Sequence, residues 1–598
     1  MLTERLIWIV PLVVAALGAW RPRAGLVVLA ASLPLFGAPP GGPYLGALDV
    51  AGIAAILTAW RGGRPSPTAM TWPVAAFVAV SLLSMLPPAY LPPSWRPSVL
   101  LGLLEIFPGV QSWSALYTWR AAADLLLGCG LFLAVRRAFS GRSLLPLAWG
   151  LLAGLTVTMG LGLAAQWGLV DLDGWRPDRD AHLPTSRMES LFFLSGWLSQ
   201  YIVFVAPVAI APICLNPRTR LLFGPLLLLV LVCLALSQQR GAWIAVAAQL
   251  AFWTAVEVKT GRLTFRRVAV MALALLIALV GVLLLSPDSL RAPLERIRAA
   301  DSVFGNRSTV WSGAAELAGQ RPFLGWGLGA FGPAFDLLRP PGDKGWTWYR
   351  LTAHNLYLHV TVERGLPGLA ALALLGTVAA WCLRRPIPGQ ELLALALAIS
   401  LVGTAVYGLV QYVYYLRNVA WLLWLLTAAA TLVSRRQGWL VATRAGQVIV
   451  LLALLLLPVR ILVLDAPAYA DDRSFGFHET ENHPEGAFRW TEGAAGYRVP
   501  WRGETMILSL ANGHPLEGKR PVTVGISIDG RPRATLTIRG GWEEHRIALG
   551  PPRGEWVVLS LDVRPVFRPF NDFRQYPQLQ PSKDIRSLGV AVREVRWE

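Results

Sequence analysis

Charged residues are scarce in this chain, and cysteines are scarcer still. Asp, Glu, Lys and Arg together make up 15% of the 598 residues, against about a quarter in soluble proteins. That shortage excludes a single soluble globular domain, and the 54% share of hydrophobic residues excludes a disordered chain. The four cysteines form no CxxC pair and have no histidine spaced to join them. Neither a zinc site nor a disulfide is therefore predicted for Cys129, Cys214, Cys233 and Cys382.

The chain is rich instead in long apolar segments, and its mean hydropathy is +0.49. A helix needs roughly 20 apolar residues to cross a bilayer. We therefore predict an α-helical polytopic membrane protein with about 12–14 transmembrane helices. These helices are expected near residues 6–20, 24–38, 45–60, 72–89, 118–135, 144–170, 191–213, 219–236, 241–257, 267–286, 354–382, 391–413, 418–434 and 446–464.

The excess positive charge lies between the apolar segments. The net charge is +18, yet residues 470–598 are nearly neutral, with 18 Lys+Arg against 17 Asp+Glu. This distribution argues against a nucleic-acid partner and for orientation in a membrane. If the basic loops face the cytoplasm, segments 90–117, 171–190 and 287–353 and everything after residue 464 lie outside it. The basic loops carry Arg21/Arg23, Arg61/Arg64, Arg136/Arg137/Arg142, Arg218/Arg220, Lys259/Arg262/Arg266/Arg267, Arg384/Arg385 and Arg435/Arg436/Arg444.

Residues 470–598 have a different pattern. Val522–Ile528 alternates apolar with small or polar residues, Asp529-Gly530 follows, and 533–538 alternates again. This pattern predicts a β-hairpin with a two-residue turn. We predict a soluble all-β sandwich at 470–598, outside the cytoplasm, after a multi-helix membrane domain at 1–466. Further strands are expected at 505–510, 545–549, 556–563 and 588–597, and loops at 491–503 and 564–587.

The outward segment 287–353 is too long for a simple connection, so we expect it to be functional. Three arginines belong to the same membrane face. Arg307 lies in this segment, Arg240 in a tight turn between two apolar runs, and Arg187 before the run that starts near 191. An arginine at a membrane boundary costs free energy unless it has a partner or reaches water. Guanidinium groups suit phosphate oxygens, and several together suit a diphosphate.

These residues also have simpler structural interpretations than a diphosphate site. An outward arginine often anchors the chain at lipid phosphates, and His354 has the position of a histidine at a helix end. The glycines at 327–332 match G-x-G-x-x-G, but no βαβ unit surrounds them, so a dinucleotide site is rejected. Asp171-Leu172-Asp173 resembles the metal-binding DxD of some sugar transferases. We favour an interfacial helix end there and leave metal binding by Asp171 and Asp173 open.

The order of the short motifs carries a resemblance. Together they resemble the O-antigen ligase and polymerase family of multi-helix membrane glycosyltransferases, and the resemblance covers roughly 180–385. No single fragment is specific to the family. The set is specific because the fragments occur in this order and are expected on one membrane face. The fragments are Arg-Gly-Ala-Trp at 240–243, Asn-Arg-x-x-x-Trp at 306–311, Pro-x-Leu-Gly-x-Gly-x-Gly at 322–329, Ala-His-Asn-x-Tyr-Leu at 353–358 and Glu-x-Gly-x-x-Gly at 363–368.

The resemblance implies a glycan donor linked to a polyprenyl diphosphate. It implies a multi-pass protein of the bacterial inner (plasma) membrane and a reaction without metal or other cofactor. The β-rich tail after residue 470 departs from the ligase pattern, and its expected periplasmic location follows from the basic loops. Family ligases move the glycan onto a sugar of the lipid A core, polymerases onto another repeat unit, and a related branch onto Ser or Thr of proteins. The functional arginines of the family match Arg240, Arg307 and, less closely, Arg187, and its functional histidine matches His354.

The chemistry of these residue types agrees with the resemblance. A sugar hydroxyl is a poor nucleophile at neutral pH, and His354, with an ordinary pKa near 6.5, can accept its proton as a general base. The diphosphate gains charge as it leaves, and the three arginines would stabilise that charge and lower the histidine pKa. Direct attack by the acceptor inverts the anomeric centre. Asn355 and Trp311 are expected to orient the base or stack on a sugar, and Glu363 is a further supporting candidate.

Two other functions stay open. A transporter or flippase of the lipid-linked glycan would need charges within the helices, for which Asp124, Glu363 and Arg364 are the main candidates. A non-enzymatic scaffold would bind envelope polysaccharide through its β domain. Tryptophans can stack on sugars, but core packing is the commoner role for Trp490, Trp501, Trp542, Trp556 and Trp597. The partners expected are the lipid-linked donor, a lipid or glycan acceptor and membrane lipids.

Overall fold

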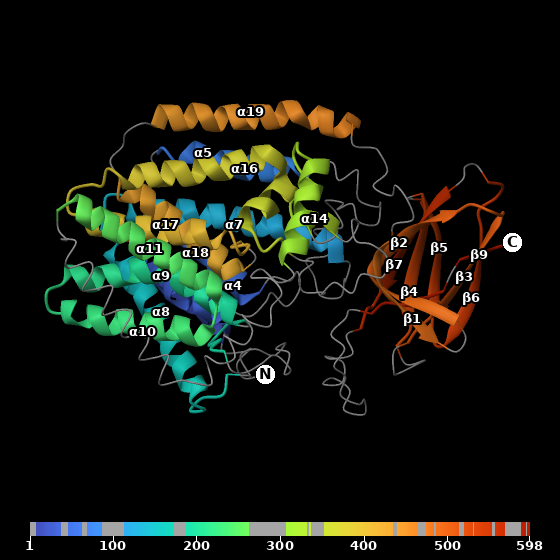
Figure 1. The fold of residues 1–598 in the computed structure, drawn as a ribbon, viewed down its shortest axis with the longest axis horizontal. Helices are drawn as coiled ribbons and strands as arrows, with labels where there is room; N and C mark the ends of the chain where they lie inside the picture. Colours follow the sequence, from blue (N-terminus) through green and yellow to red (C-terminus); the bar gives the residue numbers. More distant parts are fainter. Residues whose placement is uncertain are drawn as a thin grey trace.

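Most of the chain up to Val463 is helical, and the strands follow it (Figure 1). The computed structural model describes residues 7–36, 46–61, 68–85, 113–172, 187–192, 194–261, 307–331, 334–335, 352–414, 416–434, 439–463, 474–483, 486–513, 520–529, 531–552, 556–567, 588–593 and 595–598. The helices are α2 (Ile9–Trp20), α3 (Pro22–Ser32), α4 (Ala47–Ala59), α5 (Thr71–Leu83), α7 (Trp113–Phe139), α8 (Leu145–Gln166), α9 (Ser195–Leu215), α10 (Phe223–Ser237), α11 (Arg240–Lys259), α14 (Arg307–Gln320), α16 (Leu356–Leu383), α17 (Glu391–Tyr407), α18 (Arg417–Leu432) and α19 (Trp439–Val463).

Within the described ranges, six helical segments are long and apolar enough to cross a membrane, and shorter apolar helices accompany them. The chain is therefore a polytopic membrane protein. The apolar run predicted at 267–286 lies outside the described residues. The six segments are Leu145–Gln166, Ser195–Leu215, Arg220–Ser237, Arg240–Lys259, Leu356–Leu383 and Val441–Pro458.

Most of the described helices share one apolar core, and small residues allow them to approach closely. A Cβ atom on Gly128 of α7 would lie 2.2 Å from the indole of Trp424 of α18, and one on Gly52 of α4 would lie 2.5 Å from Trp421. Such contacts replace the hydrophobic driving force that is missing between helices in lipid. They hold α18 against both α4 and α7.

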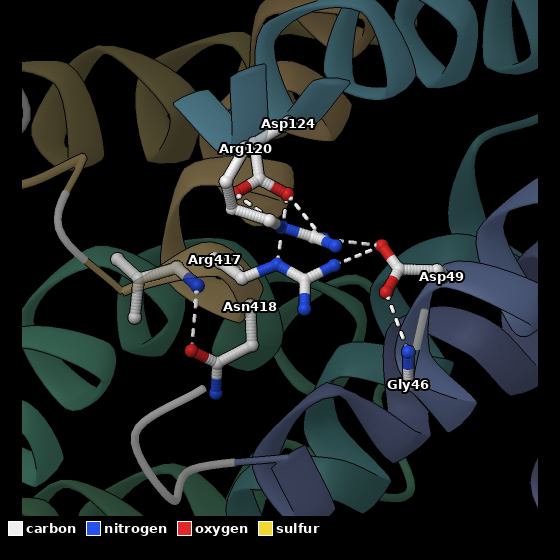
Figure 2. A network of polar contacts seen from close by, with 7 residues as sticks. Gly46, Asp49, Arg120, Asp124, Arg417 and Asn418 are labelled. Carbon is white, nitrogen blue, oxygen red and sulfur yellow. Dashed lines mark hydrogen bonds and ion pairs between the residues drawn. The ribbon is translucent and has the colours of Figure 1, made fainter. Parts of the chain in front are cut away.

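A cluster of four charges ties the same three helices together (Figure 2). Arg417 at the start of α18 donates to Asp49 of α4 and, over 2.8 Å, to Asp124 of α7. Arg120 of α7 bonds the same two carboxylates, and Asp49 also accepts the Gly46 N–H over 2.8 Å. The side chain of Asp49 is 0% exposed, so its charge depends on these partners. We call these four residues the charge quartet.

Helix α16 is broken where a glycine-rich loop crosses it. Gly365 has φ 67° and ψ −168°, which is not helical. The loop at 322–329 pairs with this break, because Trp326 N–H donates to Val362 O over 2.7 Å and Leu366 N–H donates to Pro322 O over 2.8 Å. The two motifs Pro-x-Leu-Gly-x-Gly-x-Gly and Glu-x-Gly-x-x-Gly thus form one structural unit, which we call the crossing.

The C-terminal strands form one hydrogen-bonded sheet with the order β5-β4-β7-β2-β8-β3-β6, with β1 on β2 and β9 on β3. Side chains from both ends of this order enclose one apolar core, which includes Val524, Leu561 and Leu508. Trp501 and Trp597 pack against that core. The strands are β1 (Ser474–His483), β2 (Gly486–Pro500), β3 (Thr505–Ala511), β4 (Val522–Ile528), β5 (Arg531–Ile538), β6 (Trp542–Ala548), β7 (Trp556–Arg564), β8 (Ala591–Val592) and β9 (Arg596–Trp597).

The predicted hairpin is confirmed, since β4 and β5 pair antiparallel on either side of Asp529. The prediction of a loop at 491–503 was wrong, because β2 runs through Pro500. Its sequence, rich in Gly and Ala, lacks a clear alternation, and its pairing with β1, β7 and β8 decides its conformation instead.

Candidate active site

His354 stands immediately before α16 in a strained backbone conformation. Its φ is +46°, in the left-handed region that residues other than glycine rarely adopt. Asn355 caps the helix, since its Oδ1 accepts the N–H groups of Tyr357 and Leu358 over 2.9 and 3.0 Å. A strained residue held by a firm cap is a common feature of functional sites.

The imidazole of His354 is half-buried and hydrogen-bonded. Its Nδ1 lies 2.7 Å from Oε1 of Gln411, in the loop between α17 and α18. Burial, together with the smaller effects of the charges of Arg307 and His359, lowers the pKa of His354 to about 4, although the Gln411 hydrogen bond acts in the opposite direction. The side chain is therefore neutral at pH 7 and able to accept a proton.

Arg307 is the first residue of α14, close enough for its charge to act on His354. An apolar cluster that includes Leu317 of α14 and Val362 of α16 holds α14 in place. Trp326 of the crossing fixes it further by donating its indole N–H to Leu317 O over 2.9 Å. Trp311 lies one turn after Arg307, on the same helix, and is half-buried.

Arg240 and Arg187 both lie beside the end of α10. The tight turn predicted there is confirmed, with Gln238 at φ 54° and Arg240 exposed as the first residue of α11. Arg187 precedes Met188, whose N–H donates to Leu236 O over 3.0 Å.

The turn between α10 and α11 contacts the loop that carries Gln411, the hydrogen-bond partner of His354. A Cβ atom on Gly241 would lie 2.7 Å from Val410, the residue before Gln411. Gln239 donates to Ser195 Oγ over 2.8 Å, at the start of α9. The turn that carries Arg240 is thus packed against the loop that binds His354.

Behind His354, a second histidine belongs to a buried network. His359 Nε2 lies 3.1 Å from Glu363 Oε1, one turn further along α16, and its Nδ1 accepts the Ala353 N–H over 3.2 Å. The His359 ring stacks on Tyr412 with centroids 3.5 Å apart. Glu363 Oε1 also accepts the Gly329 N–H over 2.9 Å. The network therefore joins the residue before His354 to the crossing.

Among the remaining candidates, Asn355 also has a structural partner. Asn355 donates its Nδ2 to Leu409 O over 3.0 Å, which ties the start of α16 to the α17–α18 loop. Asp171 follows α8, and Asp173 lies outside the described residues. In the part of the chain that the structure describes, no group of three or more His, Cys, Asp or Glu residues could hold a metal ion.

Sequence reasoning missed Gln411, His359 and Tyr412. The helix predicted at 391–413 includes Gln411, but α17 ends at Tyr407 and a loop follows. Gly408 after the helix, and a glutamine in an otherwise apolar run, were the available signals. His359 and Glu363 are one helical turn apart, a spacing visible in the sequence.

Residues 225–373 match the family model described as O-antigen ligase. The match includes Arg240, Arg307, Trp311, His354, Asn355 and Glu363 and leaves out Arg187. It confirms the family resemblance and assigns this segment to the O-antigen ligase family, whose general activity is glycan transfer. No curated protein matches the chain.

Proposed function

We propose that this protein transfers a glycan from a polyprenyl-diphosphate carrier to an acceptor hydroxyl at the outer face of the bacterial inner membrane. The observation that carries the proposal is the pairing of a neutral, hydrogen-bonded His354 with the charge of Arg307, within the O-antigen ligase segment. A neutral imidazole accepts protons, and a guanidinium stabilises a leaving diphosphate.

In the proposed reaction, the acceptor oxygen attacks the anomeric carbon while its proton moves to His354. The bond between the anomeric carbon and the diphosphate oxygen breaks, and its electrons remain on the diphosphate. Arg307, Arg240 and Arg187 stabilise the new charge, and no metal is needed for that role. One direct displacement inverts the configuration at the anomeric carbon.

The same proposal covers the location of the β domain and the identity of the acceptor. The β region after residue 470 would be a periplasmic sandwich domain, in line with strands that enclose one core. The acceptor distinguishes a ligase from a polymerase or a protein O-oligosaccharyltransferase, and all three share the chemistry above. A flippase is disfavoured, because Asp124 lies in the charge quartet and Glu363 binds His359.

Transfer assays in membranes test the proposal. His354→Ala and Arg307→Ala should each lower the rate of transfer from a polyprenyl-diphosphate glycan by at least about 10²-fold, with protein abundance unchanged. Arg384→Ala, at an exposed arginine after α16, is the matched control and should keep full activity. Full transfer by both test variants would end the proposal. Mass spectrometry after deletion identifies the acceptor, since free lipid A core, single-repeat chains and unmodified protein are distinguishable.

A further inference from the structure

Gln411 has a geometry that decides which nitrogen of His354 carries the proton. The Gln411 side-chain carbonyl Oε1 lies 2.7 Å from His354 Nδ1. A carbonyl oxygen can only accept a hydrogen bond, so Nδ1 must donate. In a neutral imidazole the other nitrogen, Nε2, then holds the free electron pair.

The loop that carries Gln411 is fixed along its length. Gly408 O accepts the Leu356 N–H over 2.7 Å, and Leu409 O accepts the Asn355 side chain over 3.0 Å. After Gln411, Tyr412 stacks on His359, and Val413 O accepts Gln200 Nε2 over 3.0 Å. Both sides of Gln411 are thus bound to neighbouring helices, and its amide is held against the imidazole.

We infer that Gln411 is a positioning residue that holds His354 in the tautomer with an unprotonated Nε2, the atom that receives the acceptor proton. The inference rests on the proposed function, because a base is needed only if the chain catalyses transfer. Gln411 acts through His354 and itself touches neither substrate.

An amide suits this place better than a carboxylate. Among the described residues, the charged or titratable groups whose charges lower the pKa of His354 include Arg307 of α14 and His359 of α16. A carboxylate at residue 411 would favour the protonated imidazole and would repel an incoming diphosphate. Gln411 orients the ring without adding negative charge, so the base stays neutral and the arginines stay available to the anionic donor.

Nitrogen NMR of the full-length protein in lipid nanodiscs measures the tautomer without any turnover. The chain has 7 histidines, and the His354 signals are those missing from a His354→Gln sample. With ¹⁵N-labelled histidine, wild-type His354 should show a protonated Nδ1 and an unprotonated Nε2. Gln411→Leu should convert it to a mixture of both tautomers. A protonated Nε2 in the wild type, or an unchanged tautomer in Gln411→Leu, would overturn the inference.

Kinetics provide the second measurement. Gln411→Leu should lower kcat at least about tenfold and leave the donor KM unchanged, because the base is misoriented but the arginines remain. Gln411→Glu should keep the hydrogen bond and move the acidic limb of the pH–rate profile to higher pH. Gln320→Leu, at the exposed end of α14, is the matched control and should change neither parameter.

The two hypotheses fail differently. If the wild type transfers no glycan and His354 still shows the expected tautomer, the proposed function is wrong and the positioning geometry stands. If the wild type is active and Gln411→Leu keeps its kcat, the positioning role is wrong and the transferase stands.

Discussion

Gly325 lies against the backbone of Glu363 so closely that a Cβ atom on the glycine would be 2.4 Å from the Glu363 carbonyl carbon. Gly325 also has φ +62°, a conformation that side chains disfavour. This contact closes the crossing, in which Gly327 N–H donates to Glu363 O over 2.9 Å. The glycine-rich motif at 322–329 is thus explained by the approach of two backbones and needs no bound nucleotide.

Gly325→Ala should therefore open the crossing. The methyl group has no space, so we expect a loss of at least about 2 kcal/mol in stability. Transfer should also fall, because the crossing supports both α14 and the His359 network. Thermal unfolding in detergent and the transfer assay measure the two effects. Gly376→Ala in α16, where nothing lies within 4 Å, is the matched control. Equal melting temperatures for the two variants would show that the crossing tolerates a side chain.

Much of this architecture could be predicted from the sequence. Apolar runs predicted the helices, because a membrane-spanning segment must satisfy its own backbone groups and needs a long apolar stretch. The hairpin at Asp529 followed from strict alternation and a turn motif. The motifs also pointed to Arg240, Arg307 and His354, because their residue types are chemically unusual beside a membrane.

What the sequence could not provide were contacts between distant segments. Gln411 binds His354 across 57 positions, and Arg417 binds Asp49 across 368. No local sequence pattern marks either pair, because the two partners come together only when the helices pack. The strand at β2 was missed for the same reason, since its three neighbours stabilise a sequence with little strand preference of its own.

The charge quartet should be required for stability. Asp49→Asn leaves Arg120 and Arg417 with Asp124 as their remaining carboxylate in the cluster, so an uncompensated charge is buried. We expect a loss of about 3–5 kcal/mol, measured as a lower midpoint of thermal unfolding in detergent. The double variant Asp49→Asn/Arg417→Gln should be more stable than the sum of its single changes predicts, because it restores the charge balance.

Glu391→Gln is the control for the quartet, since Glu391 is exposed in the first turn of α17. Its effect should stay within about 0.5 kcal/mol. An Asp49→Asn variant as stable as this control would mean that the charge quartet does not stabilise the packing of α4, α7 and α18.

Asn355 should act as a helix cap whose loss displaces the base. Asn355→Ala removes the acceptor for Tyr357 and Leu358, which costs about 1 kcal/mol of stability. Asn355→Asp keeps that acceptor and loses the bond to Leu409, so its stability and transfer rate should lie between those of the wild type and Asn355→Ala. If both variants lose all transfer while melting like the wild type, Asn355 has a direct catalytic role instead.

The dependence of transfer on pH should reflect the environment of His354. Its pKa of about 4 lies below the ordinary value, so the neutral base persists as the pH falls. We expect kcat/KM, which depends on the free enzyme, to stay constant from pH 7 to about 5 and to fall only near pH 4. Initial rates in membranes at saturating acceptor and low donor concentration measure this limb, with activity after return to pH 7 as the check on integrity.

A bound donor adds negative charge near His354 and should shift the acidic limb of the pH–rate profile. A diphosphate beside Arg307 offsets the positive charge that lowers the His354 pKa, so protonation becomes easier in the complex. The acidic limb of kcat, which depends on the enzyme–substrate complex, should therefore lie at higher pH than that of kcat/KM. An acidic limb of kcat/KM near pH 6.5, or a kcat limb at lower pH than that of kcat/KM, would mean that His354 is not the group that accepts the proton.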